Sequence, residues 1–207
     1  IVSKYSGSNN STSSFFFDVR DSDQKLRVTE INGTSALGLQ SNDSISENTW
    51  THVVYVRTST TCEFFINGSS SGGSQSRTSN INDGGTTTIS IGERQANKRF
   101  IGKIDQVRFF DRALTSSEVN TLYGETFDSA TKSTTDIFAD RSGVALYQLD
   151  GNANDTGGAT GYLNEGAIFD GSSSVITLPT GSFTYTTFSI TAWIKQTAQD
   201  SSDIILE

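Results

Sequence analysis

The sequence contains a single cysteine, a single proline and no methionine among its 207 residues. Because Cys62 has no second cysteine to pair with, an intramolecular disulfide is excluded. No apolar run is long enough to span a membrane, and no signal peptide is visible. Since an initiator methionine is missing, we expect the chain to be a fragment or a processed piece of a longer protein.

Charge is sparse and mostly negative. Only 18% of the residues are charged, and 23 acidic side chains outnumber 15 basic ones, which gives a net charge of −8. That balance argues against nucleic acid or an anionic membrane surface as a partner. Ser, Thr, Asn and Gly are abundant instead, which favours an exposed extracellular β protein over a cytoplasmic enzyme. The length fits one large β domain or two small ones.

The hydrophobic period changes in the middle of residues 100–123. Three apolar residues in the first half of this stretch predict a strand: Ile104, Val107 and Phe109. In the second half, Thr115 is followed three residues later by Glu118, which is the pattern of a helix capping box. We therefore expect one short helix, at about residues 115–123, in a chain whose other patterns are those of strands.

The clearest hairpin lies within residues 50–66, where side chains alternate between two faces, a threonine-rich turn follows, and a second strand returns. Three consecutive phenylalanines, Phe15 to Phe17, break the alternation of an earlier strand. Either one of them points away from the main core, or both faces of that strand are covered. Residues 32–49 predict a loop with at most one short strand.

A second set of strand patterns begins after residue 143. Residues 125–143 have the composition of a linker, and the chain then resumes with strands around an Asp170-Gly171 turn and at residues 186–197. We therefore divide the chain into segments 1–124 and 144–207, joined by that linker.

Ordered motifs in the two segments resemble the laminin-G-like, concanavalin A-like jelly roll. The first segment carries TWTHVVYVR, FFING, ISIGE and GKIDQVRFFDRALTSSEV, and the second carries ALYQLDGNAND, AIFDGSSSVITLP and FSITAWIK. The resemblance is to the short, disulfide-free type found in bacterial surface and phage proteins, often as tandem repeats. It implies an all-β fold, an antiparallel two-sheet jelly-roll β-sandwich, with the short helix as its one helical element.

The order of these motifs differs from the order in that family, where the ALYQLDGNAND-like motif comes first. Residues 1–124 therefore resemble the C-terminal half of one domain, and residues 144–207 resemble the N-terminal half. Three explanations are open: a piece of a tandem array cut across a repeat boundary, a circular permutant that closes on itself, or halves that complete neighbouring chains by domain swapping. We favour the piece of a tandem array.

No catalytic arrangement stands out in the sequence. Glucanases of the superfamily that the chain resembles carry acidic residues two and then three apart on one strand, which positions the carboxylates for glycoside cleavage. No such triplet occurs here, and Asp18, Asp21 and Asp23 fit turn chemistry instead. His52 and Cys62 fit strand positions, and their spacing does not suggest a catalytic pair. We therefore expect a protein that is not an enzyme.

A calcium site is one candidate. Ca²⁺ takes six to eight oxygen ligands from carboxylates, amides and carbonyls, and the resemblance implies a structural cation near a turn such as LDGNANDTGG. The candidate ligands are Asp105, Asp150, Asn152, Asn154 and Asp155. The alternative is that these turn residues satisfy only their own backbone.

Lectin-like sandwiches bind sugars through exposed aromatic, amide and charged side chains on loops at one rim. The candidates for such ligand binding are Tyr5, Asn9, Asn10, Arg94, Asn97 and Tyr162. Trp50 and Trp193 lie within strand patterns, so we expect them in the core.

These features favour a lectin-like binding or adhesion module on an extracellular, cell-surface or virion appendage, with a glycan or another cell-surface ligand as its partner. The alternative is a purely structural repeat, such as a spacer, fibre or decoration module, that contacts neighbouring repeats or copies of itself. We expect no cofactor apart from a structural Ca²⁺.

Overall fold

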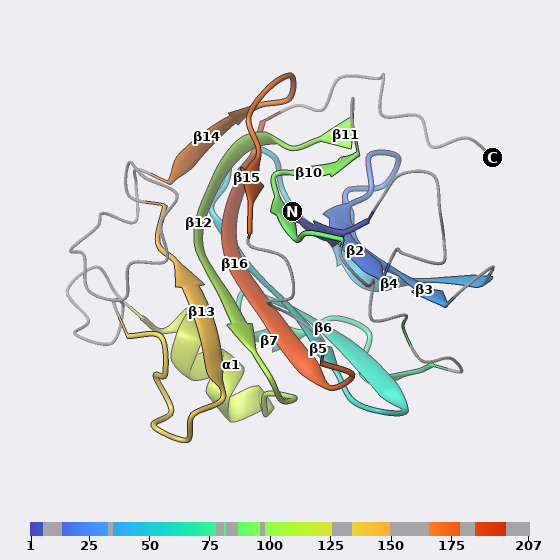
Figure 1. Cartoon of the computed structure of the whole chain (residues 1–207), viewed down its shortest axis with the longest axis vertical. Helices are drawn as coiled ribbons and strands as arrows, with labels where there is room; N and C mark the ends of the chain where they lie inside the picture. The colour runs from blue at the N-terminus through green and yellow to red at the C-terminus, as the bar shows by residue number, and fades with distance from the viewer. Residues whose placement is uncertain are drawn as a thin grey trace.

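The computed structural model describes residues 1–5, 14–32, 35–77, 81, 87–95, 98–125, 134–149, 166–178 and 185–197. Over these residues the chain forms two large antiparallel sheets and one helix, α1 (Ser116–Tyr123) (Figure 1). The expected two-sheet jelly-roll β-sandwich with one short helix is confirmed. Within the same residues, no helix is both long enough and apolar enough to cross a membrane.

The smaller sheet has six strands in the order β15-β9-β1-β2-β3-β4. In that order their bounds are β15 (Ile176–Thr177), β9 (Ser90–Ile91), β1 (Val2–Lys4), β2 (Phe15–Val19), β3 (Lys25–Asn32) and β4 (Ser35–Ser44). A separate two-stranded hairpin, formed by β10 (Glu93–Gln95) and β11 (Lys98–Arg99), lies beside the N-terminal strand (Figure 1).

The larger sheet has eight strands in the order β13-β12-β16-β5-β6-β7, with β14 also paired to β12 and β8 to β6. The bounds are β13 (Gly143–Tyr147), β12 (Ile101–Phe110), β16 (Phe188–Gln196), β5 (Thr51–Arg57), β6 (Thr61–Ile66), β7 (Ser69–Ser70), β14 (Ala167–Asp170) and β8 (Gln75–Ser76).

Strands from both segments of the chain build each sheet. Strand β16 lies between β12 and β5 and pairs with both, and the short β15 pairs with β9 at the edge of the smaller sheet (Figure 1). The division at residues 124 and 144, the linker between them and the permuted order of the motifs stay predictions, as do the three explanations for that order.

The main core lies between the sheets, and a second core lies on the opposite face of the larger sheet, under α1. The second core consists of Val54, Val56, Phe65, Phe110, Leu114, Val119 and Leu122. Strand β5 is therefore buried on both faces, as its unbroken buried pattern shows. The three phenylalanines of β2 are likewise all buried, with Phe15 and Phe17 in the main core and Phe16 on the other face. Both alternatives for these phenylalanines hold, because Phe16 points away from the main core and the other face of β2, on which it lies, is also covered.

A β-bulge explains the uneven spacing of the apolar residues in β12. Ile104, Val107 and Phe109 all belong to the main core, although strict alternation would place Ile104 and Val107 on opposite faces. The pairing with β16 shifts register between Asp105 and Arg108, and Gln106 between them has a φ of 51°. One extra residue in the strand restores the inward direction of Val107.

The predicted capping box is present at the start of α1. The Thr115 side chain accepts a hydrogen bond from the Glu118 backbone N–H, and the Glu118 carboxylate accepts one from the Thr115 N–H. Gly124 ends the helix and donates its N–H to the Asn120 carbonyl. The prediction of this helix from residues 115–123 is confirmed.

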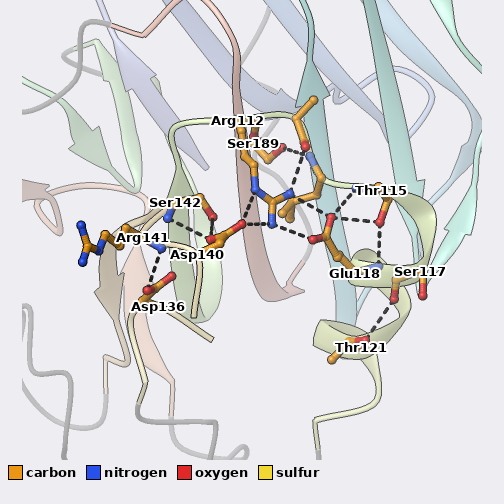
Figure 2. A network of polar contacts seen from close by, with 12 residues as sticks. Arg112, Thr115, Ser117, Glu118, Thr121, Asp136, Asp140, Arg141, Ser142 and Ser189 are labelled. Carbon is orange, nitrogen blue, oxygen red and sulfur yellow. Dashed lines mark hydrogen bonds and ion pairs between the residues drawn. The ribbon is translucent and has the colours of Figure 1, made fainter. Parts of the chain in front are cut away.

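A network around Arg112 fixes the helix to the sheet (Figure 2). Its guanidinium donates to both carboxylate oxygens of Glu118, at 2.9 and 2.6 Å, and through Nε to Asp140 at 2.7 Å. The hydrogen bonds from Arg112 lower the pKa of the Glu118 carboxyl to about 2. Ser189 on β16 donates to the Arg112 carbonyl and accepts from the Leu114 N–H. These contacts hold α1 over the second core.

Two sequence predictions about the fold are wrong. Strand β4 runs for ten residues where the sequence predicted a loop with at most one short strand, because its backbone pairs with β3 along nearly its whole length. Trp50 and Trp193, expected in the core, are only half-buried and belong to neither core. Trp193 points to the outer face of β16 and stacks there with Tyr123, at the end of α1.

Candidate functional site

A charged pocket lies where the β10–β11 hairpin packs beside β1, and residues of β2 and β3 complete its lining. Figure 1 shows this hairpin beside the N-terminus. Four cationic and three acidic side chains line it: Arg27, Arg94, Lys98, Arg99, Asp18, Asp21 and Glu93. The other lining residues are Ile1, Val19, Gly92 and Phe100. We call this site the Arg94 pocket. A concave site in which several polar groups converge is the usual starting hypothesis for ligand binding.

The β2–β3 pair supplies the wall formed by Asp18 and Arg27. The two residues are directly opposite each other in the register of the sheet, on its outer face. Arg27 donates from Nε to Asp18 Oδ1 at 3.0 Å and from Nη2 to Asp18 Oδ2 at 2.6 Å. This two-point pairing holds both side chains in fixed positions, since a guanidinium and a carboxylate match in geometry.

The β10–β11 hairpin supplies the facing wall. Glu93 and Arg99 are cross-strand partners and form an ion pair of 2.9 Å. Gly92, with a φ of 85°, leads into the hairpin, and a side chain there would overlap the ring of Phe169. Glycine is required at this position both for its backbone conformation and for the close approach of that ring.

Arg94 lies over two aromatic rings. Its guanidinium carbon is 4.3 Å from the ring centre of Phe16 on β2 and 5.6 Å from that of Tyr5, and these two rings meet edge to face. Arg94 also approaches Asp18, with 4.0 Å between Nη1 and Oδ2. Cation–π contacts of this kind stabilise a guanidinium and restrict its orientation.

The structure brings together two of the six residues predicted to bind a ligand, Tyr5 and Arg94. The other four, Asn9, Asn10, Asn97 and Tyr162, lie outside the described residues. The assignment of ligand binding to all six stays a prediction.

Sequence reasoning missed most of the pocket. Asp18 was assigned to turn chemistry, and that interpretation is wrong because Asp18 lies within β2, on its outer face. Asp21 and Asp23 do lie in the turn that follows, and Asp23 accepts a hydrogen bond there from the Lys25 N–H. The signal that could have identified Arg27 is its charge, which is opposite to that of Asp18 on the neighbouring strand. That signal can be read only once the register of the two strands is known.

The residues predicted to bind calcium are not those that line the Arg94 pocket. Asp105 lies on β12 with no exposed surface, and it packs so close to Gly166 that a Cβ at that glycine would lie 2.9 Å from the Asp105 Cβ. Its four proposed co-ligands, Asp150, Asn152, Asn154 and Asp155, lie outside the described residues. Among the residues that are described, no group of three or more His, Cys, Asp and Glu side chains could hold a metal ion. The calcium site stays a prediction.

His52 and Cys62 lie in strands β5 and β6, as the sequence predicted, and both are buried. The His52 ring packs against the rings of both Tyr123 and Trp193. Burial, together with the positive charge of Arg108, lowers the pKa of His52 to about 3. Burial and the nearby Glu30 carboxylate raise the pKa of the Cys62 thiol to about 12. At neutral pH, His52 is therefore uncharged and Cys62 is a thiol, not the thiolate that acts as a nucleophile.

Comparisons with known proteins place this geometry in a family. No curated protein and no solved structure matches the chain. A laminin-G-type family model, described as the concanavalin A-like lectin/glucanases superfamily, matches residues 1–120. The matched range is more than half of the chain, and it includes every residue that lines the Arg94 pocket. The two-sheet sandwich agrees with that match, and the chain belongs to the concanavalin A-like lectin/glucanases superfamily.

Proposed function

We propose that this chain is a non-catalytic, lectin-like binding module that recognises a glycan in the Arg94 pocket. The observation that carries the proposal is the arrangement of Arg94 over Tyr5 and Phe16, beside the paired Asp18 and Arg27. Sugars present hydroxyl groups that donate and accept hydrogen bonds as well as apolar C–H faces. A pocket with fixed carboxylates, guanidinium groups and a neighbouring aromatic ring offers a partner for each.

The superfamily is compatible with such a module, but it also includes glucanases, so the absence of catalysis is part of the proposal. Glycoside cleavage needs one carboxyl to donate a proton and a second to act as base or nucleophile. Both oxygens of Asp18 already accept hydrogen bonds from Arg27, and Glu93 is paired with Arg99. Two of the three carboxylates in the pocket are therefore committed to fixed ion pairs.

We also propose a location and a cofactor for the module, from the composition and the motifs of the sequence. We place the module on an extracellular, cell-surface or virion appendage. We assign it at most a structural Ca²⁺, with Asp105, Asp150, Asn152, Asn154 and Asp155 as ligands, none of which lines the Arg94 pocket. Binding in the pocket itself then needs no metal, and the experiment below separates the two sites.

A glycan array probed with the full chain, with and without added calcium, tests the function. Because the pocket itself needs no metal, binding to one sugar class is expected in both conditions. Tyr5→Ala and Arg94→Gln should each weaken that binding about tenfold, which corresponds to about 1.4 kcal/mol. Arg141→Gln is the matched control, because it removes the same charge from an exposed residue in the loop before β13.

Two results would contradict the proposal. The first is that the protein binds no glycan on the array in either condition. The second is glycan binding that neither pocket variant weakens. Release of reducing sugar from a bound β-glucan, abolished by Asp21→Asn, would contradict the non-catalytic part alone.

A second candidate, a structural module that contacts other protein subunits, rests on β4. This strand ends the smaller sheet and carries Asp43 as its single charged residue over ten positions. Long edge strands with few charges are suited to pairing with another chain. Stable oligomers of the full chain, dispersed by Leu37→Lys on β4, together with silence on the glycan array would favour this candidate.

A further inference from the structure

Arg94 has more hydrogen-bonding capacity than its neighbours use. A guanidinium carries five N–H donors and no acceptor. Among the described residues, its one ion-pair partner is Asp18, at 4.0 Å, which is longer than a hydrogen bond. Both oxygens of Asp18 are already occupied by Arg27, and Arg94 Nε is buried without a hydrogen-bond partner. The guanidinium therefore retains donors for a further acceptor.

The position of Arg94 is nevertheless fixed. Its side chain is only 16% exposed, and its guanidinium lies over the rings of Phe16 and Tyr5. A guanidinium that is already ordered loses little conformational freedom when it binds, so less of the interaction energy is spent on ordering it. Arg94 is thus prepared to receive an acceptor before any ligand arrives.

The charges of the pocket favour an anionic acceptor. Arg27 is neutralised by Asp18 at 2.6 Å, and Arg99 by Glu93 at 2.9 Å. Among the described residues, Arg94 has only the Asp18 carboxylate, which it shares with Arg27, at 4.0 Å. Guanidinium groups pair with carboxylates and other oxyanions through two parallel N–H···O bonds, which are about twice as strong as neutral hydrogen bonds. A neutral hydroxyl would leave this capacity unused.

The surroundings limit how much negative charge the ligand can carry. The chain as a whole has a net charge of −8, and Asp18, Asp21 and Glu93 line the same pocket. A densely charged polymer would place several anionic groups near these carboxylates and in the negative field of the protein. One isolated anionic group, set among neutral hydroxyls, avoids that repulsion.

We infer that the Arg94 pocket selects a saccharide that carries an isolated carboxylate, such as a hexuronic acid within an otherwise neutral glycan. The carboxylate pairs with the guanidinium of Arg94, and the hydroxyls donate to the carboxylates of the pocket. This inference rests on the proposed function, because it names the ligand class of the same site. It adds a charge selectivity that the superfamily membership does not contain.

The test compares two oligosaccharides that differ only at one carboxyl, a uronic-acid-containing oligosaccharide and its carboxyl-reduced neutral counterpart. Both are titrated into the full chain by isothermal calorimetry. We expect the acidic ligand to bind at least about tenfold more tightly, as one charge-assisted pairing provides. That preference should shrink as the salt concentration rises, because the pairing is partly exposed.

Variants at Arg94 assign the preference to this side chain. Arg94→Gln should bind the acidic and neutral ligands equally. Arg94→Lys keeps the charge but loses the two-point geometry, so its preference for the acidic ligand should lie between that of Arg94→Gln and that of the unaltered protein. Arg141→Gln, with the same loss of charge in an exposed loop, should keep the full preference. If thermal denaturation shows that Arg94→Gln is unfolded, the salt dependence and Arg94→Lys still decide.

The outcomes separate this inference from the proposed function. Equal binding of the two ligands by the unaltered protein overturns the charge selectivity and leaves the lectin-like function in place. Absence of binding to either ligand and to every member of the glycan array overturns both. Tighter binding of a densely sulfated polysaccharide than of the uronic-acid ligand overturns the preference for an isolated charge.

Discussion

Glu30 is the acidic centre of an ion cluster buried between the two sheets. It lies on β3 with 1% of its surface exposed and accepts hydrogen bonds from Tyr55 Oη at 2.6 Å and from Arg57 Nε at 2.7 Å, both on β5 of the facing sheet. Arg77, which follows β8, donates from Nε to Glu30 Oε2 at 2.9 Å. One carboxylate therefore connects three side chains through the interior of the sandwich.

We predict that Glu30→Ala lowers the free energy of unfolding by about 3–5 kcal/mol, the usual cost of removing one partner from a buried ion pair. The substitution leaves Arg57, which has no exposed surface, and Arg77, which is 6% exposed, without their shared carboxylate. It also takes the hydrogen-bond acceptor from the buried Tyr55 hydroxyl. A domain is stable by about 5–15 kcal/mol, so this loss is a large share of the total.

Equilibrium urea unfolding, followed by tryptophan fluorescence and circular dichroism, measures the effect. Glu47→Ala is the control, since Glu47 is exposed, and it should change stability by no more than about 0.5 kcal/mol. A cost for Glu30→Ala below about 1 kcal/mol, or equal to that of the control, would refute the argument that this carboxylate balances buried charge.

A combined variant distinguishes charge from packing as the source of the cost. Replacing the whole cluster, with Glu30→Leu, Arg57→Leu and Arg77→Met, removes the three buried charges of the cluster and keeps much of its volume. Such replacements are often neutral or stabilising, so we expect the triple variant to be more stable than Glu30→Ala. If the triple variant is instead as unstable as the single one, lost packing rather than an unbalanced charge explains both.

Two further predictions concern a titrating group and a glycine. Burial lowers the pKa of His52 to about 3 in the folded protein. Between pH 6.5 and about 3, therefore, this histidine takes up a proton only in the unfolded chain. The free energy of unfolding should fall as the pH is lowered, by about 2 kcal/mol from pH 7 to pH 5. His52→Phe should lose this dependence in urea unfolding at the two pH values, and equal slopes for both proteins would show that His52 is not responsible. Gly102→Ala should lower the free energy of unfolding by about 3 kcal/mol, because its Cβ would meet the Lys195 carbonyl oxygen and lie 2.9 Å from Gln196 Cα. Gly73→Ala is the control in thermal denaturation, since Gly73 also has a positive φ but nothing within 4 Å, and an equal loss from both variants would contradict the steric argument.

The helix and its strand were predictable because their signals are local. A capping box needs only Thr115 and Glu118 three residues apart, and the structure has both of its hydrogen bonds. The spacing of Ile104 and Val107 contains a further local signal. An apolar pair three apart in a strand indicates a bulge between its members, and the structure has one at Gln106.

Strand β4 was not predictable in the same way. Its sequence, SALGLQSNDS, is short of β-branched and aromatic residues and contains Gly38, so its intrinsic strand preference is low. Its ladder with β3, from Asn32–Ser35 to Lys25–Ser44, is made by backbone groups whose pairing does not depend on side-chain identity. Tertiary pairing here overrides the local preference of the residues.

The pocket shows the same division between local and distant information. Arg94 and Tyr5 could be proposed from residue type alone, as charged and aromatic residues flanking polar loops. The pairing of Asp18 with Arg27 depends instead on the register of β2 against β3, and that register is set by the buried face of the strands rather than by these two charges. The residues next to Asp18 in the sequence predict a turn, because they carry no information about the strand that pairs with β2.

The second segment of the chain helps to shape the pocket although none of its residues lines it. The ring of Phe169 on β14 packs against Gly92 at the start of the β10–β11 hairpin, and Arg99 of that hairpin donates to the Ser172 carbonyl. Ser172 in turn lies in a tight turn that is held by Asp170, which accepts its N–H at 2.9 Å. The hairpin that carries Arg94 is therefore held in place at Gly92 and at Arg99 by residues of the second segment. The match to residues 1–120 contains every lining residue of the pocket, but the position of its hairpin wall depends on strands supplied from beyond residue 166.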